Sequence, residues 1–159
     1  MITILKTDLK LPKHQADFLQ LLNVYATDIM GGGAAIGNHL HQQLIEGLQN
    51  TPHKLILLVY DDENPIAIAN CFYGFSTFKA KPLLNIHDFA VAPEARGKGV
   101  AKLLLERIAE EAKTAGCCKI TLEVLEGNKR AQKVYFDFGF ENYELDPIAG
   151  KALFLEKLI

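Results

Sequence analysis

The chain lacks several features that would assign it to a functional class at once. Its formal net charge is -2, so it has no basic surplus of the kind that nucleic-acid binding uses. No apolar run is long enough to span a membrane, and the first residues do not have the pattern of a signal peptide. We therefore expect a cytoplasmic protein with neither a nucleic-acid nor a membrane partner.

Cysteine is scarce, and its placement does not indicate a zinc centre. The chain has three cysteines, of which Cys117 and Cys118 are adjacent and cannot easily bridge to each other. No CxxC and no histidine-rich spacing accompanies them. We expect all three to be small buried hydrophobic residues, and we expect no metal.

The length and the composition are those of an ordinary globular domain. With 159 residues, 49% of them hydrophobic and 23% charged, the chain is predicted to form a single domain over residues 1–159. Apolar periodicity predicts the order β-αα-βββ-α-β-α-ββ. The predicted fold class is α/β, with a mixed, mostly antiparallel sheet of about seven strands and flanking helices.

The boundaries of these elements follow from periodicity and from turn residues. Gly74 could mark a bulge within its strand. The predicted strands are Met1 to Thr7, Lys54 to Tyr60, Ile66 to Thr77, Leu83 to Ala92, Lys119 to Leu125, Glu141 to Asp146 and Ala152 to Leu158. The predicted helices are Lys13 to Thr27, one that carries Leu40 to Leu48, Val100 to Ala115 and one that begins after Asn128.

Three consecutive glycines, Gly31 to Gly33, separate the first two predicted helices. Such a run is unfavourable inside a helix, so it predicts a flexible connector. A plain hinge loop is one interpretation. A mobile substrate lid is the other, because lids need backbone freedom and often use small residues.

The most informative stretch leaves a strand at Pro93, turns through Arg96 to Gly99 and enters a helix at Val100. The first turn of a helix has N–H groups without intrahelical partners and a partial positive charge, which suits a phosphate. Two known patterns fit poorly: Lys98 is followed by Gly99 where the Walker pattern needs Ser or Thr, and the dinucleotide pattern lacks its third glycine. An ordinary strand–turn–helix without a ligand is the alternative.

What the stretch from Arg96 to Ala101 does match is Gln/Arg-x-x-Gly-x-Gly/Ala, and it resembles the acetyl-CoA pyrophosphate loop of the GNAT acetyltransferase superfamily. The segment Asn128 to Phe140 resembles the second motif of that superfamily, N-x-x-A-x-x-x-Y-x-x-x-G-F. Asn128 and Tyr135 lie about two helical turns apart and face the same way. Without the resemblance they would be a helix-capping asparagine and a core tyrosine. The run Gly74 to Val91 looks like the branch that acetylates small-molecule amines, such as diamines.

The resemblance implies the GNAT fold and acetyl-CoA as co-substrate. It implies that the backbone of one strand pairs with the pantetheine arm and that the amides after Arg96 hold the pyrophosphate. The coenzyme-binding residues it implies are Phe89, Ala90, Val91, Arg96, Gly97, Lys98, Gly99, Val100, Ala101, Lys102, Asn128 and Tyr135.

The same resemblance implies an N-acetyltransferase in which a primary amine of a small molecule attacks the thioester directly. Where the diamine branch has Leu-Glu-Asp, with the Glu as proposed base, this chain has Ile86-His87-Asp88. His87 or water would then take the proton of the amine, since histidine exchanges protons near neutral pH. Tyr135 would act as the acid toward the coenzyme thiolate. Strand alternation predicts that His87 and Asp88 point to opposite faces unless a bulge intervenes.

The sequence does not identify the amine that accepts the acetyl group. Asp28 and Asp88 are candidate substrate-binding residues. A protein N-acetyltransferase and a non-catalytic module that binds or senses acetyl-CoA are alternatives. A structural protein without a ligand and a phosphate-transferring enzyme fit the motifs less well. The apolar segment Leu153 to Leu158 could pair in a homodimer or close the sheet of the monomer.

Overall fold

The computed structural model describes residues 1–159, and the chain packs as two compact units, Met1–Leu122 and Glu123–Ile159. The first unit holds one five-stranded sheet in the order β1-β2-β3-β4-β5. Its strands are β1 (Ile2–Lys6), β2 (Lys54–Asp61), β3 (Asn64–Ser76), β4 (Lys81–Val91) and β5 (Ile120–Leu122). The single domain over residues 1–159 stays a prediction.

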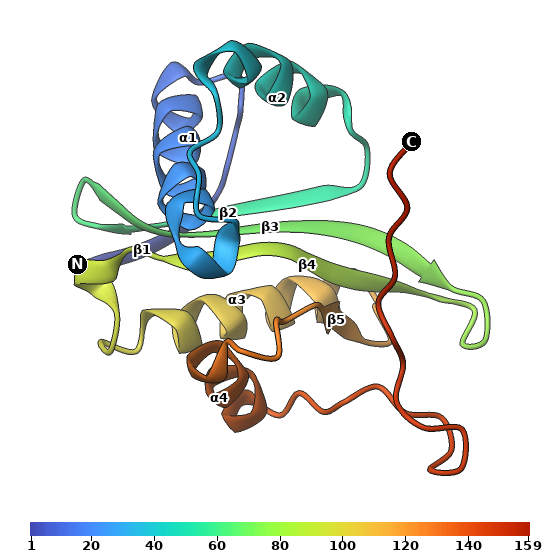
Figure 1. Cartoon of the computed structure of the whole chain (residues 1–159). Helices are drawn as coiled ribbons and strands as arrows, with labels where there is room; N and C mark the ends of the chain where they lie inside the picture. Colours follow the sequence, from blue (N-terminus) through green and yellow to red (C-terminus); the bar gives the residue numbers. More distant parts are fainter. The chain divides into compact units, whose positions relative to one another are not determined.

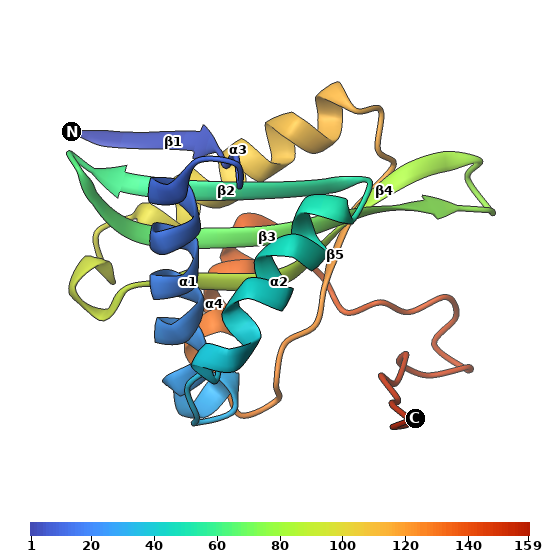
Figure 2. The ribbon, with the colours of Figure 1, turned by 90° about the horizontal axis from the view of Figure 1, so that it is seen from above.

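Helices cover both faces of this sheet. The first pair, α1 (Pro12–Thr27) and α2 (Asn38–Asn50), lies across the strands on one face, and α3 (Val100–Thr114) covers the other (Figures 1 and 2). Two short 3-10 turns, η1 (Ile29–Gly31) and η2 (Pro93–Ala95), follow α1 and β4. No helix has both the length and the hydropathy that crossing a bilayer requires.

The antiparallel meander that the sequence predicts is confirmed. β1 pairs with β2, β2 with β3 and β3 with β4, all antiparallel, and β5 returns parallel to β4 after the crossover through α3. The run from Leu55 to Tyr60 is buried throughout. This explains its near-continuous apolar sequence, because a strand that is covered on both faces has no solvent side.

The predicted count of seven strands is wrong, because the sheet has five. The expected closing strands, Glu141 to Asp146 and Ala152 to Leu158, do not form. This part of the chain has only an isolated bridge between Glu144 and Lys151, the residue before the second expected strand. A segment with strand-like apolar residues forms a strand only where a neighbouring strand completes its hydrogen bonds. Two strands alone have marginal stability in water. The strand predicted over Lys119 to Leu125 is likewise reduced to β5.

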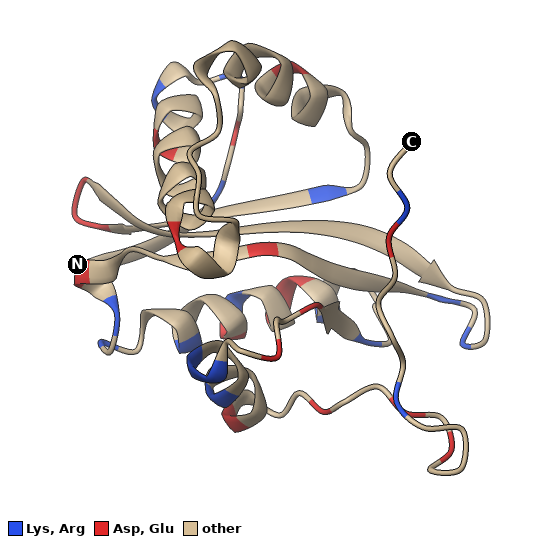
Figure 3. Ribbon diagram, viewed as in Figure 1, with Lys and Arg blue, Asp and Glu red and all other residues tan.

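The second unit is built around α4 (Lys129–Phe138). Asn128 caps it as predicted, with its Oδ1 accepting the N–H of Ala131 at 3.1 Å. Gly139 ends it at φ 106°, a left-handed conformation that favours glycine. The chain then folds back so that the Phe140 N–H reaches the Tyr135 carbonyl at 3.0 Å. This helix carries three basic residues, Lys129, Arg130 and Lys133, which colour much of its ribbon blue (Figure 3).

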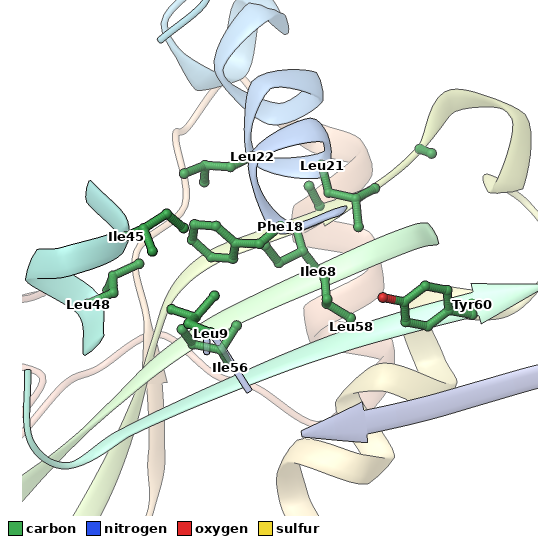
Figure 4. Close-up of a cluster of buried hydrophobic side chains, with 12 residues drawn as sticks. Leu9, Phe18, Leu21, Leu22, Ile45, Leu48, Ile56, Leu58, Tyr60 and Ile68 are labelled. Atoms are coloured by element: carbon green, nitrogen blue, oxygen red, sulfur yellow. The ribbon is translucent and has the colours of Figure 1, made fainter. Parts of the chain in front are cut away.

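The core between α1, α2 and the sheet holds α1 in place (Figure 4). Phe18 and Leu21 of α1 are fully buried against Leu58 and Ile68 of the sheet. At the edge of this core the Tyr60 hydroxyl donates to Asp17 Oδ2 at 2.7 Å, and Lys13 Nζ donates to the same oxygen at 2.8 Å.

Replacing Tyr60 by Phe removes one of the two donors to the buried Asp17 carboxylate. Because hydrogen bonds to charged groups contribute about 1.5–3 kcal/mol, we expect the free energy of unfolding to fall by about 1–2 kcal/mol. Urea denaturation measures this. Tyr73→Phe is the matched control, because the hydroxyl of Tyr73 forms no hydrogen bond. If both variants lose the same free energy of unfolding, the hydrogen bond from Tyr60 to Asp17 does not stabilise the fold.

Candidate functional site

A row of unpaired amides begins α3. The backbone N–H groups from Gly97 to Lys102 donate to no carbonyl and no side chain, whereas the Arg96 N–H bonds to the Pro93 carbonyl. Gly97 and Gly99 have φ of 75° and 80°, where a side chain would strain the backbone. The turn lies at the N-terminus of α3, where the helix dipole is positive. Such a row is suited to binding an anion.

The side chain of Arg96 fastens this turn to its surroundings. Its Nε donates to the carbonyl of Val91, the last residue of β4, at 2.9 Å. Its Nη2 pairs with Asp28 Oδ2 at 3.2 Å. Asp28 also accepts the Met30 N–H on its Oδ1 and thereby caps η1. One guanidinium therefore connects the glycine turn, the end of β4 and the Gly31 to Gly33 segment.

The outer edge of β4 is open beside this turn. β5 pairs only with Leu84, Asn85 and Ile86 of β4, while β4 itself continues to Val91. From His87 to Val91 the strand pairing of β4 is with β3 only, and the Val91 carbonyl accepts the bond from Arg96. The expected coenzyme-binding residues Phe89, Ala90 and Val91 lie on this open edge. An extended ligand could add to it as a further strand.

A bulge in β4 corrects the expected alternation of His87 and Asp88. Asn70 of β3 stands opposite Asp88, but the next residue, Cys71, stands opposite Ile86, so His87 is the extra residue. The ring of His87 contacts Phe72 at 5.5 Å between centroids, and Phe72 packs on the core under α1 and α2. Asp88 bonds to Asn70 on that same face. The bulge thus allows both side chains to serve one face, whereas Gly74, the predicted position of a bulge, keeps its register.

Two groups near Asp88 were not singled out from the sequence. Asn70 is buried, and its Nδ2 donates to Asp88 Oδ2 at 3.0 Å. Burial raises the pKa of Tyr25, and the charges of Asp88 and Asp28 raise it further. The available signal for Asn70 was a polar residue inside the apolar run from Ile66 to Phe72. The carboxylates of Asp88 and Asp28 thus both act on the hydroxyl of Tyr25.

The remaining predicted site residues, Asn128 and Tyr135, belong to the second unit. Asn128 is occupied as a helix cap through its Oδ1. The ring of Tyr135 contacts that of Phe140 at 5.7 Å between centroids. Their expected contacts with a coenzyme stay predictions.

Comparison with known proteins identifies the family of this chain. The model of the acetyltransferase (GNAT) family matches residues 19–140. This chain belongs to the GNAT family. Thialysine N-epsilon-acetyltransferase of Bos taurus is 34% identical to it over 71 residues, which are 45% of this chain and 41% of the bovine protein. An uncharacterized N-acetyltransferase of Bacillus subtilis (strain 168) is 37% identical over 68 residues, or 43% of this chain and 42% of that protein. The matches span less than half the length of these curated relatives.

Solved structures show that this GNAT chain has the fold of the family over nearly its whole length. The crystal structure of a probable acetyltransferase superposes with a TM-score of 0.82 at 22% identity, covering 99% of each chain. The structure of AAC(6')-Iy, in complex with the bisubstrate analogue CoA-S-monomethyl-acetylneamine, superposes with a TM-score of 0.78 at 18% identity, covering 100% of this chain and 99% of that one.

Replacing Asp28 by Asn separates its contact with Met30 from its contact with Arg96. The amide oxygen can still cap η1, but the charge that pairs with Arg96 is lost. We expect faster hydrogen exchange over residues 28–34 and a loss of about 1 kcal/mol or less in the free energy of unfolding, as for a partly exposed ion pair. Hydrogen-exchange mass spectrometry and urea denaturation measure these effects. Asp137→Asn, which removes the exposed pair with Lys133, is the control; unchanged exchange over residues 28–34 in Asp28→Asn would show that Arg96 does not hold this segment.

Proposed function

We propose that this GNAT chain is an acetyl-CoA-dependent N-acetyltransferase that moves the acetyl group to a primary amine of a small molecule. The observation that carries the proposal is the run of unpaired N–H groups from Gly97 to Lys102 beside the open edge of β4. The donors suit a pyrophosphate, and the edge suits an extended arm with amide groups. Acetyl-CoA combines these two parts and supplies an activated acetyl thioester.

The coenzyme site draws mainly on the backbone. The amides from Gly97 to Lys102 hold the pyrophosphate, and the backbone of Phe89, Ala90 and Val91 pairs with the pantetheine arm. Lys98 and Lys102 are exposed and add positive charge near the phosphates. Arg96 contributes differently, because its guanidinium is bonded to Val91 and Asp28. It fixes the shape of the turn. The family motif of the second unit adds a contact from Asn128.

On the acceptor side, the face that carries the bulge supplies the base. An alkyl ammonium must lose a proton before its nitrogen can attack the thioester carbonyl carbon. His87 is exposed beside Phe72 and takes this proton directly or through water. Tyr135, at the family position, gives a proton to the departing sulfur. The carbon–sulfur bond breaks as the carbon–nitrogen bond forms, and the nitrogen then loses a second proton, which restores the hydroxyl of Tyr135. The products are the amide, the coenzyme thiol and the one proton that His87 passes to water.

The relatives support a small-molecule acceptor. The bovine relative is named for thialysine, an amino acid with a side-chain amine, and a structural neighbour is an aminoglycoside acetyltransferase with a TM-score of 0.79. A protein acceptor is the second candidate, since a ribosomal-protein-alanine N-acetyltransferase from Brucella melitensis has the same fold with a TM-score of 0.70. Assays on amines and on peptide N-termini separate the two.

The coenzyme assignment predicts a thermal shift with acetyl-CoA. At one hundred times its dissociation constant a ligand stabilises the native state by about 2.7 kcal/mol, which for this length raises Tm by roughly 5–10 °C. ATP and NAD serve as controls. A shift with ATP or NAD alone would refute the assignment of the glycine turn. A shift with acetyl-CoA without turnover on amines or peptides would identify a binding module instead of an enzyme.

The acid–base assignment predicts the kinetics of two variants. His87→Ala should lower kcat by about 10²-fold and remove a limb from its pH profile, because water replaces a positioned base. Tyr135→Phe should lower kcat by about 10-fold or more, because the sulfur loses its donor. His39→Ala and Tyr143→Phe are matched controls that should keep wild-type turnover. If the two site variants also keep it, with an unchanged pH profile, neither residue is the acid or the base.

A further inference from the structure

Asn70 carries a buried acceptor that the chain leaves unsatisfied. The residue is 4% exposed, its Nδ2 donates to Asp88 Oδ2 at 3.0 Å, and its Oδ1 has no hydrogen-bond partner. Turning the amide round would bring two acceptor oxygens together, so Asp88 fixes its orientation. A buried oxygen without a donor is costly to the fold. Its presence calls for an explanation beyond packing.

The neighbouring carboxylate of Asp88 is also incompletely paired. It is half-buried, and no lysine, arginine or histidine side chain lies within salt-bridge distance of it, whereas the nearby Asp28 is paired with Arg96. Its charge acts on its surroundings, since it contributes to the raised pKa of Tyr25, after burial, and to that of Cys71, again after burial. Asp88 is thus a carboxylate that lacks a cation.

One kind of group satisfies both residues together. A primary ammonium has three N–H donors and a full positive charge, so it can donate to the Asp88 carboxylate and to Asn70 Oδ1 at once. A water molecule could donate to the amide oxygen, but it would not neutralise the carboxylate. A neutral amine would leave the same charge uncompensated.

We propose that Asn70 and Asp88 together bind the ammonium group of the acceptor, so that the substrate is a small molecule with a protonated alkyl amine. This rests on the proposed function and narrows its substrate. The position agrees with that function, because Asp88 lies on the open edge of β4, next to Phe89. Asn70 is then a specificity-determining residue on a strand that the family motifs do not include.

The test compares variants on whichever of thialysine, spermidine and sisomicin is the best acceptor. Asn70→Leu removes the amide at similar volume, and Asp88→Asn removes the charge. Each should raise KM by about tenfold or more, with the dissociation constant of acetyl-CoA unchanged, because one donor–acceptor or charge contact to the ammonium is lost. Asn70→Ser keeps a small hydrogen-bond acceptor and should recover part of the affinity for the amine. It also serves as the test variant if Asn70→Leu does not fold.

Asn85→Leu is the matched control, because Asn85 bonds to Thr121 within the sheet and has no contact with Asp88. It should leave KM within twofold of wild type. If Asn70→Leu and Asp88→Asn also stay within twofold, the ammonium site is refuted. It is equally refuted if wild type binds acetyl-CoA but neither binds nor acetylates any of the three amines. Failure to bind acetyl-CoA would instead refute the proposed function.

Discussion

The insertion of His87 into β4 determines how the acceptor face is assembled. Because β3 has no residue to match it, the strand is displaced by one position, and Asp88 comes to lie opposite Asn70. A regular ladder would send His87 and Asp88 to opposite faces of the sheet. The bulge instead lets an exposed imidazole and a half-buried carboxylate serve the same side. The base and the ammonium-binding group that we propose are then on the same face of the sheet.

The coenzyme site that we propose depends on backbone groups rather than on side chains. β4 keeps an open edge beyond Ile86 because β5 ends its pairing there, and the glycine turn exposes N–H groups that no carbonyl accepts. Backbone donors need a fixed chain path to act as a site. Arg96 supplies part of that constraint by bonding to Val91 and Asp28. Its charge therefore shapes the turn as well as adding to the local potential.

Short sequence patterns correctly predicted the features that depend only on neighbouring residues. Asn128 as a helix cap, Gly139 as a helix end and the glycine turn at Gly97 and Gly99 all follow from a few neighbouring residues, and all are confirmed. The long apolar run from Lys54 to Tyr60 likewise predicted a strand that is covered on both faces. The two closing strands failed, because the strand-like alternation near Leu153 needs a partner that its own residues cannot supply.

The sequence by itself determined the family motifs, the antiparallel meander, the order of the helices and the position of the glycine turn before α3. These depend on hydrophobic periodicity and on backbone conformations that a few residues dictate. Only the tertiary structure decided that His87 is a bulge, that Arg96 meets Asp28 across 68 positions of sequence, and that Asn70 lies beneath Asp88. The bulge and the position of Asn70 depend on strand register, and the pairing of Arg96 with Asp28 depends on a long-range side-chain contact. Both arise from the packing of the whole sheet against its helices, which no local pattern encodes.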